Sequence, residues 1–489
     1  MPDSTYERLM TPQDANSSPL QFGGGDGLSL ETAYTISKAE HLLKLARDVN
    51  GGISYGGSHF RLTDDIDLGG VSWRPVGYCT GPFDKREFCG VFDGAGHAVK
   101  GFVVENQGKR SSGLFGYIEY AVIQNLYVED FEIKGGDSAG GIVGYAETSS
   151  IVSCCAEGKI SPVSSSNVGG IVGLASSSVI ENSVSNVFVD VTGANASGGM
   201  CGYIYNGTKI ANCEARGAIH AVDSDGAGGF VGIAKDSSME NCHSKVTLDC
   251  TECAHMGGFG GYIRGCRVDW CTAHKDVVSN NDRAGPLVGG FAGLTSGLLT
   301  RCAAASGVKK MGMKGSAGGF AGDIAGGSIY ACYARGGVTG EGSVGGFAGS
   351  MECRDGSATV ENCYCLGPVT SGEKGSRSGG FVGVMNRRGG DPVVMRCYSF
   401  GELSPLVKGF TVKQSIGSIV DCVWRKDNLA FNDKCEDGRG IQELSTEQFG
   451  DRDFFSGINW SIYDDNDGIW RYLDEITPRR PHLNGVPLL

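Results

Sequence analysis

Hydrophobic and polar positions along this chain repeat with a period near 29 residues. Each period opens on the pair GlyGly, followed by an apolar residue, a small residue and another Gly, and a polar stretch then leads to a second short apolar run. Successive pairs lie 27 to 34 residues apart. The pairs begin at Gly140, Gly169, Gly198, Gly228, Gly257, Gly289, Gly318, Gly345 and Gly379. A nearly constant interval in this range predicts a solenoid.

The two apolar runs place one type of side chain at one position in each repeat. The residues after the pairs are Ile142, Ile171, Met200, Phe230, Phe259, Phe291, Phe320, Phe347 and Phe381. The second runs end at Cys155, Ser183, Cys213, Cys242, Cys271, Cys302, Cys332, Cys363 and Cys397. No stretch between copies has an apolar stripe of helical period, whereas short β-branched and aromatic runs between Gly-rich breaks are typical of strands. The pattern predicts an all-β fold, a right-handed parallel β-helix of about 11 coils.

The ends of the chain depart from this period and predict two caps. Residues 1–24 are polar and rich in Ser and Pro, which predicts a disordered leader, and 25–112 predict an N-terminal cap with the first coils. Repeats then occupy 113–430, and 431–489 predict a C-terminal cap.

Each cap contains one short helical pattern. Ser37 and Glu40 form a capping-box pattern before KAEHLLKLARDVN, and the GlyGly at 51 predicts the helix end. Ser445 predicts a second, short helical turn. We expect aromatic residues to close the last coil, namely Trp460, Trp470 and Tyr472.

Charge and composition narrow the classes of partner. The chain has 489 residues, a net charge of −13 and a pI of about 5.2, which argues against a nucleic acid or an anionic membrane as partner. There is no apolar run long enough to cross a membrane and no secretory signal pattern at the N-terminus. The all-β, Gly-rich character favours an extracellular or cell-surface location, as a piece of a larger exported protein. The alternative is an intracellular or phage-borne β-solenoid, which is suggested by the missing secretory signal pattern and by the free thiols.

Nineteen cysteines raise the question of disulfides and metals. Most lie at one repeat position, where parallel side chains favour a column of free, buried thiols over disulfides. Cys79 and Cys89 flank a loop, and a disulfide between these two residues remains an alternative. A zinc site remains a second alternative; its ligands would come from Cys250, Cys253, His255, Cys266 and His274. We predict no cofactor and no metal.

The repeats resemble a known family. The strings GGFVGIAKDSSMENCHSKVTL, FRLTDDIDLGGVSWRPVG and GVFDGAGHAVKG are similar to those of the GLUG-repeat proteins of bacterial surfaces. In that family the repeats accompany adhesins, immunoglobulin A peptidases and some carbohydrate-active chains. The peptidase module is absent here, since none of the eight His residues is followed by Glu. The resemblance implies a scaffold and leaves the activity open.

Carboxylates that break the repeat pattern are the candidates for catalysis. The position after GGxxG is aromatic or aliphatic until it becomes Asp323, and the next coil carries Glu352 and Asp355. Stacked coils would bring these three together as acid and base of a glycoside hydrolase or polysaccharide lyase, in a groove around 318–391. Solvated loop residues are the simpler interpretation.

Candidate ligand-binding residues lie on the same face. Arg354, Arg387 and Asp391 belong to the same irregular coils, and Tyr203 and Tyr262 belong to an aromatic column that could stack on sugar rings. Packing of coil on coil is the alternative role for these tyrosines. The first functional hypothesis is an adhesin-like surface protein that binds a polysaccharide or host glycan. The second is the hydrolase or lyase, and the oligomeric state is unknown.

Overall fold

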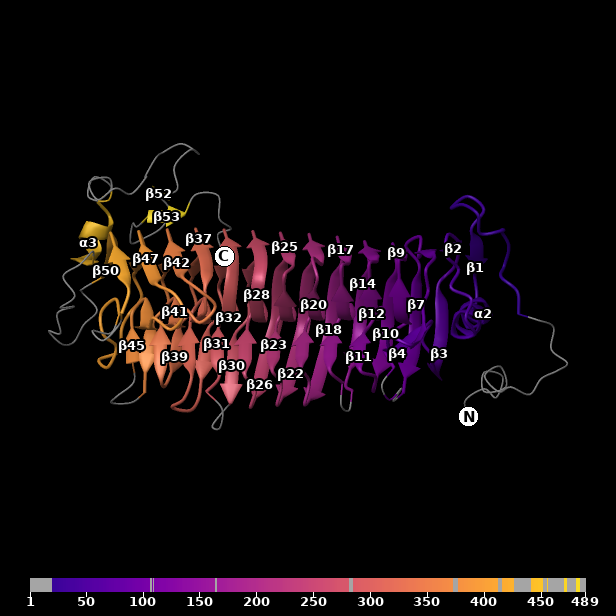
Figure 1. The fold of residues 1–489 in the computed structure, drawn as a ribbon, viewed down its shortest axis with the longest axis horizontal. Helices are drawn as coiled ribbons and strands as arrows, with labels where there is room; N and C mark the ends of the chain where they lie inside the picture. The colour runs from indigo at the N-terminus through magenta and orange to yellow at the C-terminus, as the bar shows by residue number, and fades with distance from the viewer. Residues whose placement is uncertain are drawn as a thin grey trace.

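The computed structural model describes residues 20–105, 108, 110–162, 165–280, 285–372, 377–411, 416–425, 441–451, 455, 470–472 and 481–483. It is a parallel β-solenoid of about 13 turns, which confirms the predicted fold class. The turns stack along one axis and form a rod (Figure 1). At one strand spacing per turn the rod is roughly 60 Å long. The predicted number of about 11 coils was too small, because the turns before residue 113 lack the GlyGly motif.

Three parallel sheets run along the rod. Sheet 1 has 22 described strands. They are β1 (Tyr34–Ile36), β2 (His59–Leu62), β6 (Val91–Asp93), β8 (Phe115–Glu119), β9 (Val122–Gln124), β12 (Val143–Glu147), β13 (Ser150–Val152), β16 (Val172–Ser176), β17 (Val179–Glu181), β20 (Cys201–Tyr205), β21 (Lys209–Ala211), β24 (Val231–Lys235), β25 (Ser238–Glu240), β28 (Gly260–Asp269), β32 (Ala292–Thr300), β36 (Ala321–Ile324), β37 (Gly327–Tyr330), β41 (Ala348–Met351), β42 (Ala358–Glu361), β46 (Val382–Met385), β47 (Pro392–Met395) and β49 (Ser418–Val420).

Sheet 2 contains three strands of nine residues in the middle turns. Its strands are β3 (Ile66–Ser72), β7 (Ala98–Val104), β10 (Tyr127–Ile133), β14 (Cys155–Ile160), β18 (Val184–Thr192), β22 (Glu214–Val222), β26 (His243–Thr251), β29 (Thr272–Ala273), β30 (Val277–Asn280), β33 (Ala303–Ala304), β34 (Val308–Lys310), β38 (Tyr333–Ala334), β39 (Val338–Gly340), β43 (Tyr364–Cys365), β44 (Val369–Ser371), β48 (Tyr398–Ser399), β50 (Cys422–Arg425) and β51 (Ile441–Leu444).

Sheet 3 is the shortest, with nine described strands of three residues. They are β11 (Ser138–Gly140), β15 (Asn167–Gly169), β19 (Ala196–Gly198), β23 (Gly226–Gly228), β27 (His255–Gly257), β31 (Leu287–Gly289), β35 (Ser316–Gly318), β40 (Ser343–Gly345) and β45 (Arg377–Gly379). Two antiparallel pairs lie outside the stack: β4 (Tyr78–Gly81) with β5 (Asp84–Arg86), and β52 (Trp470–Tyr472) with β53 (Pro481–Leu483).

The GlyGly pair marks the place where sheet 3 turns into sheet 1. A Cβ atom at Gly228 would lie 2.0 Å from the carbonyl oxygen of Val231, and one at Gly229 would lie 2.2 Å from that of Gly258 in the next turn. A side chain at either position would therefore collide with backbone, which is why the pair recurs in each repeat.

Two interior columns hold the turns together. The rings of Phe230, Phe259, Phe291, Phe320, Phe347, Phe381 and Phe410 stack in one row, with neighbouring centroids 4.7 to 4.9 Å apart and the planes nearly parallel. The predicted Phe column is confirmed. Since each ring between Phe259 and Phe381 is buried between two others, these turns contribute apolar area to both of their neighbours.

The cysteine column is also present, with one correction to the predicted row. Cys154, and not Cys155, shares its position with Ser183, because Ser153 takes a left-handed corner (φ 54°) and the next side chain points inward. The backbone N–H of Cys154 lies 3.1 Å from the Ser183 hydroxyl, and the N–H of Ser183 lies 3.4 Å from the Cys213 sulfur. The described cysteines are all free thiols.

The N-terminal helix α2 (Ala39–Asn50) lies at the first turns, with its apolar side buried. Its N-cap is Lys38, so the predicted Ser37 capping box is wrong. The backbone N–H of Ser37 instead donates to Nδ1 of His41, at 3.1 Å. The helix ends at Gly51, as predicted.

The C-terminal region covers the outer face of the last turns. Helix α3 (Thr446–Phe449) has Ser445 as N-cap, as predicted, and the side chain of Gln448 completes a capping box. The rings of Tyr364 and Tyr398 stack on the outside of sheet 2, and Trp470 lies against both, with centroids 6.0 and 5.8 Å away. Trp460 lies outside the described residues, as does most of the predicted leader at 1–24. At the end of that leader Phe22 packs 4.8 Å from Tyr34.

Candidate ligand-binding strip

One outward-facing residue per turn lies in register along sheet 1, and we call this row the corner column. Its members, from the N-terminal end, are Tyr117, Tyr145, Leu174, Tyr203, Ile233, Tyr262, Leu294, Asp323, Ser350 and Val384. The residue after each one points into the solenoid, as Ile118 and Ile324 do. The column is therefore an external feature in which the register of the fold aligns residues 27 to 34 positions apart.

The corner column lies in the angle between sheets 1 and 3. The ring of Tyr262 stacks on His255 of β27, with centroids 5.4 Å apart. The hydroxyl oxygens of Ser350 and Ser316 are 3.0 Å apart. A Cβ atom at Gly226 would lie 2.6 Å from Ile233. Outward side chains in this angle are partly sheltered from solvent, and Ile233 is only 5% exposed.

Four half-buried tyrosines and one lysine form a continuous strip in the middle of this column, and we call them the aromatic strip. The hydroxyls of Tyr145 and Tyr205 lie 3.2 Å apart, and the rings of Tyr203 and Tyr205 are 5.4 Å apart. The Lys235 ammonium lies over two rings, 5.3 Å from the centroid of Tyr203 and 5.9 Å from that of Tyr262. Cation–π contacts of this kind stabilise the ammonium of a lysine that forms no ion pair with any described carboxylate.

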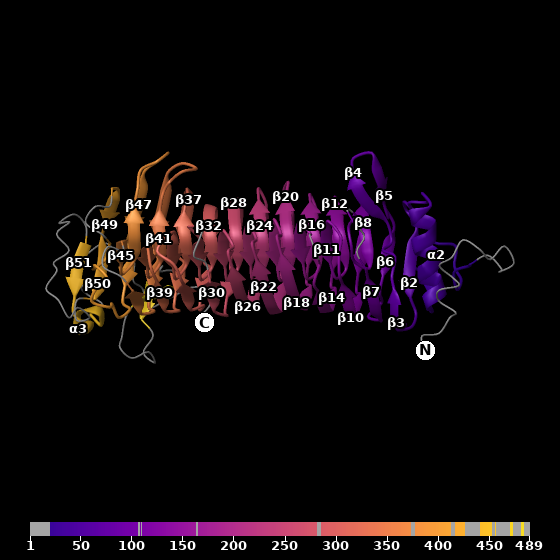
Figure 2. The same ribbon diagram turned by 90° about the horizontal axis from the view of Figure 1, so that it is seen from below.

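An acidic group closes the N-terminal end of the strip. The buried Tyr117 hydroxyl lies 2.7 Å from a Glu147 carboxylate oxygen and 3.0 Å from one of Glu119, and Lys85 pairs with Glu119 at 2.6 Å. Burial, followed by the Glu147 carboxylate, raises the pKa of Tyr117 far above its ordinary value. Lys85 lies on β5, so the β4–β5 hairpin covers Tyr117. The hairpin projects from the rod in Figure 2.

The C-terminal end of the column holds the predicted catalytic residues. Asp323 is fully buried, its carboxylate accepts a hydrogen bond from the Ser350 hydroxyl at 2.7 Å, and it pairs with the Arg354 guanidinium. The backbone N–H of Glu352 donates to the same carboxylate at 3.2 Å. Burial raises the pKa of Asp323 above its ordinary value, although Ser350 and Arg354 act in the opposite direction.

The other charged candidates lie on the neighbouring loops, and each has a partner of opposite charge. Glu352 accepts from the Asn386 amide at 2.8 Å and pairs with Arg388 at 2.6 Å. Asp355 lies 3.4 Å from Arg264. These loops join β41 to β42 and β46 to β47, and they project on the same side of the rod as the hairpin (Figure 2).

Arg387 and Asp391 form an exposed pair of their own. The structure thus brings Asp323, Glu352 and Arg354 together, and it places the Asp355 and Arg387–Asp391 pairs beside them. Each carboxylate of this group already has a cationic partner. Asp323 has no exposed surface through which a substrate could reach it. The arrangement favours an ion-pair network that holds two irregular turns together over a pair of free catalytic acids.

This network predicts a clear difference between two arginines. Replacing Arg354 with Met is expected to lower the free energy of unfolding by roughly 3 kcal/mol, because the buried Asp323 carboxylate loses its cation. Replacing Arg387 with Met should change it by less than about 0.5 kcal/mol, since its pair is exposed. The double variant Asp323→Leu/Arg354→Met should recover most of the loss, because Leu294 and Val384 occupy neighbouring column positions. Urea unfolding followed by circular dichroism measures all three, and an Arg354→Met midpoint equal to that of the wild type would contradict the network.

The alternative metal site is not formed. Cys250 and Cys253 are buried on the inside of the solenoid, whereas Nδ1 of His255 lies on the outside, 2.8 Å from the carbonyl of Asp225. Within the described residues no group of His, Cys, Asp and Glu has the geometry for a metal ion. Cys79 and Cys89 carry free, half-buried thiols. None of the helices in the described part of the chain has the length and apolar character that crossing a membrane needs.

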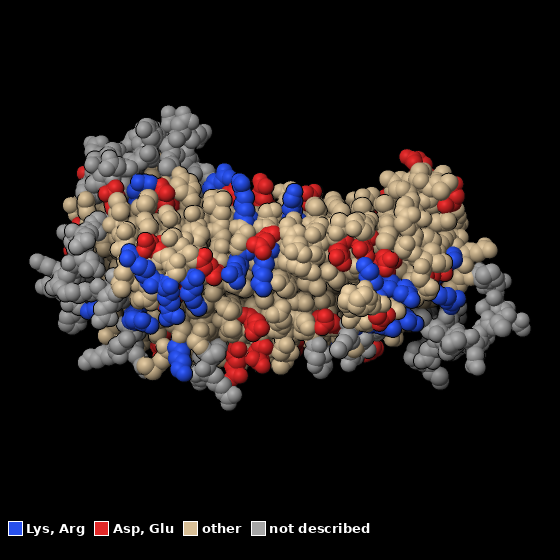
Figure 3. Space-filling model, in the orientation of Figure 1, with Lys and Arg blue, Asp and Glu red and all other residues tan. Residues whose placement is uncertain are grey.

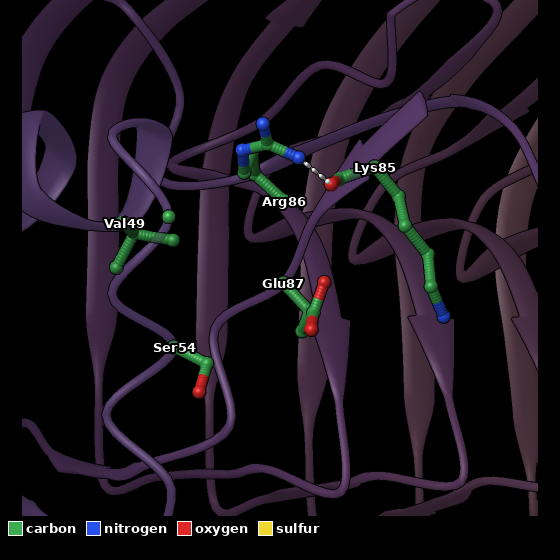
Figure 4. A pocket seen from close by; sticks show the side chains of 6 residues that line it. Val49, Ser54, Lys85, Arg86 and Glu87 are labelled. Carbon is green, nitrogen blue, oxygen red and sulfur yellow. Dashed lines mark hydrogen bonds between the residues drawn. The ribbon is translucent and has the colours of Figure 1, made fainter. Parts of the chain in front are cut away.

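A cavity of about 290 Å³ lies near the N-terminal end, between the end of α2 and strand β5 (Figure 4). Its walls include Val49, Ser54, Lys85, Arg86 and Glu87. Arg86 donates to the carbonyl of Lys85 at 2.8 Å, and the Lys85 ammonium points to Glu119. The cavity offers little apolar surface, and its charges of both signs lie close together, so the aromatic strip is the stronger candidate for a ligand site.

Sequence reasoning found Tyr203 and Tyr262 but missed Tyr205, Lys235 and the Glu119–Glu147 pair. These lie two residues beyond the corner column, at a position that the repeat fills with Glu, Ser, Tyr, Lys or Arg. A signal was present in the alternation of Tyr145, Leu174, Tyr203, Ile233 and Tyr262. That column was recognised in the sequence, whereas the position two residues after it was not compared between repeats.

Comparisons with known proteins give limited matches. No family model matches the chain. A stretch of 147 residues is 27% identical to halomucin of Haloquadratum walsbyi; it covers 28% of this chain and about 2% of that protein. A crystal structure described as that of "a putative immunoglobulin A1 protease" from Bacteroides ovatus aligns with a TM-score of 0.42 and 23% identity, over 53% of this chain and 80% of the other.

Proposed function

We propose that this chain is a cell-surface or secreted solenoid that binds a polysaccharide or host glycan along the aromatic strip. The observation that carries the proposal is the row of outward tyrosines at one side of the rod, in the angle between two sheets. Aromatic rings held in a partly sheltered angle give large contact area at low cost in side-chain entropy. Three of them lie in register, so they can contact successive units of a linear ligand.

The setting at a cell surface has two supports. The partial match to halomucin is a match to a protein named as a mucin, and the GLUG-type strings resemble repeats of bacterial surface proteins. Free thiols are compatible with an oxidising extracellular environment here, because the column from Cys213 to Cys422 is buried and is therefore shielded from oxidants. Assignment to the GLUG-repeat proteins remains part of this proposal.

The test is retention on immobilised polysaccharides. The wild-type chain is expected to be retained by at least one member of a panel of plant, bacterial and host polysaccharides. The double variant Tyr203→Ala/Tyr262→Ala is expected to lose about tenfold or more in affinity, because each stacked ring contributes on the order of 1 kcal/mol. Tyr127→Ala is the matched control, since Tyr127 is 44% exposed on sheet 2, away from the strip.

The same panel separates the binder from the enzyme. Release of reducing ends that is lost in Asp323→Asn would establish the hydrolase or lyase and contradict a binder without catalysis. Retention without release is the result that we expect. Equal retention of the wild type and the double tyrosine variant would contradict the location of the site.

A further inference from the structure

Lys235 is a cation with no ion-pair partner in the part of the chain that the structure describes. Its ammonium lies over the rings of Tyr203 and Tyr262, and among the described residues no carboxylate oxygen lies within ion-pair distance of it. The adjacent Asp236 faces the next turn, where a Cβ atom at Gly265 would lie 2.2 Å from its carboxylate oxygen. The positive charge of Lys235 is therefore available to an anionic group that arrives from outside.

From Tyr145 to Tyr262 the tyrosines of the corner column occupy every second turn, whereas Tyr117 lies on the turn directly before Tyr145. Tyr145, Tyr203 and Tyr262 alternate with the aliphatic residues Leu174 and Ile233. Two turns correspond to a rise of about 10 Å. This is comparable with the length of a disaccharide in an extended, β-linked glycan, so equivalent faces of every second sugar could meet successive tyrosines.

Charge changes sign along the strip. Glu119 and Glu147 lie at the N-terminal end, while Arg264, Arg354 and Arg388 follow in the direction of the C-terminus. Figure 3 shows Lys and Arg side chains gathered on this face of the rod where Figure 1 labels β41 and β45. An anionic ligand would be repelled beyond Tyr145, where Glu147 lies, and would meet the Lys235 ammonium beside Tyr203; the three arginines are each paired with a carboxylate.

We propose that the strip takes a linear acidic glycan with a two-sugar repeat, in which every second sugar is a uronate. In this arrangement Tyr203 and Tyr262 stack on the uncharged sugars, and Lys235 pairs with the carboxylate of the uronate between them. The inference rests on the proposed function, because it names the ligand class of that same site. Lys235 is then the residue that determines specificity for charge.

The experiment compares three probes by isothermal titration with the full chain. A hyaluronan hexasaccharide supplies alternating uronates, N-acetylchitohexaose supplies a neutral β-linked chain of equal length, and oligogalacturonate supplies a uronate at every sugar. We expect the alternating probe to bind at least tenfold more tightly than the neutral one. Lys235→Met should weaken its binding about tenfold, the loss of one charge-assisted contact. Lys235→Arg should stay within about threefold of the wild type. Lys209→Met is the control, because Lys209 is an exposed lysine of sheet 1 outside the strip.

The outcomes separate this inference from the proposed function. One outcome is that the neutral and alternating probes bind equally and Lys235→Met has no effect, while Tyr203→Ala/Tyr262→Ala loses binding. That result would support the glycan site and overturn the inference that its ligand is acidic. If oligogalacturonate binds as tightly as hyaluronan, the two-sugar spacing is overturned. If no member of the polysaccharide panel binds, both proposals fail.

Discussion

Raising the pH from 8 to 10 is expected to destabilise this solenoid more than any single substitution. Burial raises the pKa of six interior thiols well above the ordinary value, namely those of Cys201, Cys250, Cys271, Cys302, Cys332 and Cys397. In the unfolded chain these thiols ionise near pH 8.5. Because the folded pKa is the higher one, their stabilising contribution is complete below pH 8.5 and is lost as the pH rises toward the folded values.

The expected loss is about 2 kcal/mol at pH 10 for each thiol that stays protonated in the folded chain. Summed over these six thiols, of which Cys271, Cys302, Cys332 and Cys397 belong to the cysteine column, the loss is comparable with the whole stability of a typical domain. Guanidinium unfolding followed by circular dichroism, in the presence of a reductant, measures it. Replacing Cys302 and Cys332 with Ser should reduce the pH dependence, and Ser183 shows that this position accepts a hydroxyl. An unfolding midpoint that stays constant between pH 8 and 10 would contradict the buried thiol column.

The buried Lys310 has the opposite effect: it makes the folded state more stable as the pH rises. Lys310 is 2% exposed, and burial lowers its pKa to about 8. Its ammonium donates to the carbonyl of Glu341 at 2.9 Å. Between pH 8 and its unfolded pKa the folded state gains stability from this group. Contacts with neighbouring thiols lower the pKa of Cys253 and Cys363, so these two thiols do not add to the loss. One lysine cannot offset the six thiols whose pKa is raised, so the net direction stays destabilising.

Truncation of one ring in the Phe column is expected to have the next largest effect. In Phe320→Ala the free energy of unfolding should fall by about 4 kcal/mol, because the ring lies 4.9 Å from both Phe291 and Phe347 and a cavity would remain. In a solenoid each turn is stabilised by its two neighbours, so the loss should also weaken the coupling between the two halves of the rod. Differential scanning calorimetry is expected to show a lower and broader transition.

The same substitution on the outside is the control for the Phe column. Phe188 is 44% exposed on β18, and Phe188→Ala should change the free energy of unfolding by less than about 0.5 kcal/mol. Phe320→Met should lower the free energy of unfolding clearly less than Phe320→Ala, because Met200 fills the equivalent position in the turn before Phe230. Equal transitions for Phe320→Ala and Phe188→Ala would mean that the rings do not form a stacked core.

The fold was predictable because one constraint repeats. The GlyGly pair is required by backbone contacts in each turn, so its spacing reveals the stack, and the residues after it reveal the Phe column. The first turns were undercounted because Ile36, Phe60 and Phe92 fill their core without that motif. The shift from Cys155 to Cys154 follows from a left-handed corner that precedes each residue of the cysteine column, at Ser153 as at Asn182 and Asn212. The apolar pattern does not mark this corner, and the CysCys pair offers two cysteines for the position after it.

The candidate site was predictable only in part. Asp323 was found because it interrupts an apolar column, but its pairing with Arg354 depends on the course of an irregular loop. The contact of Lys235 with two tyrosines depends on register between three turns. Likewise, the Ser37 cap failed because His41 one turn later offers a competing acceptor. Such contacts follow from local geometry rather than from the repeat.

Hydroxyl-radical footprinting of the tyrosines, with and without a retained polysaccharide, tests the location of the binding site most directly. We predict that the ligand protects Tyr203, Tyr205 and Tyr262 from oxidation and leaves Tyr120 and Tyr127, which are exposed elsewhere on the rod, unchanged. Protection of Tyr120 or Tyr127 with no change at Tyr203 and Tyr262 would place the ligand on another face and contradict the account.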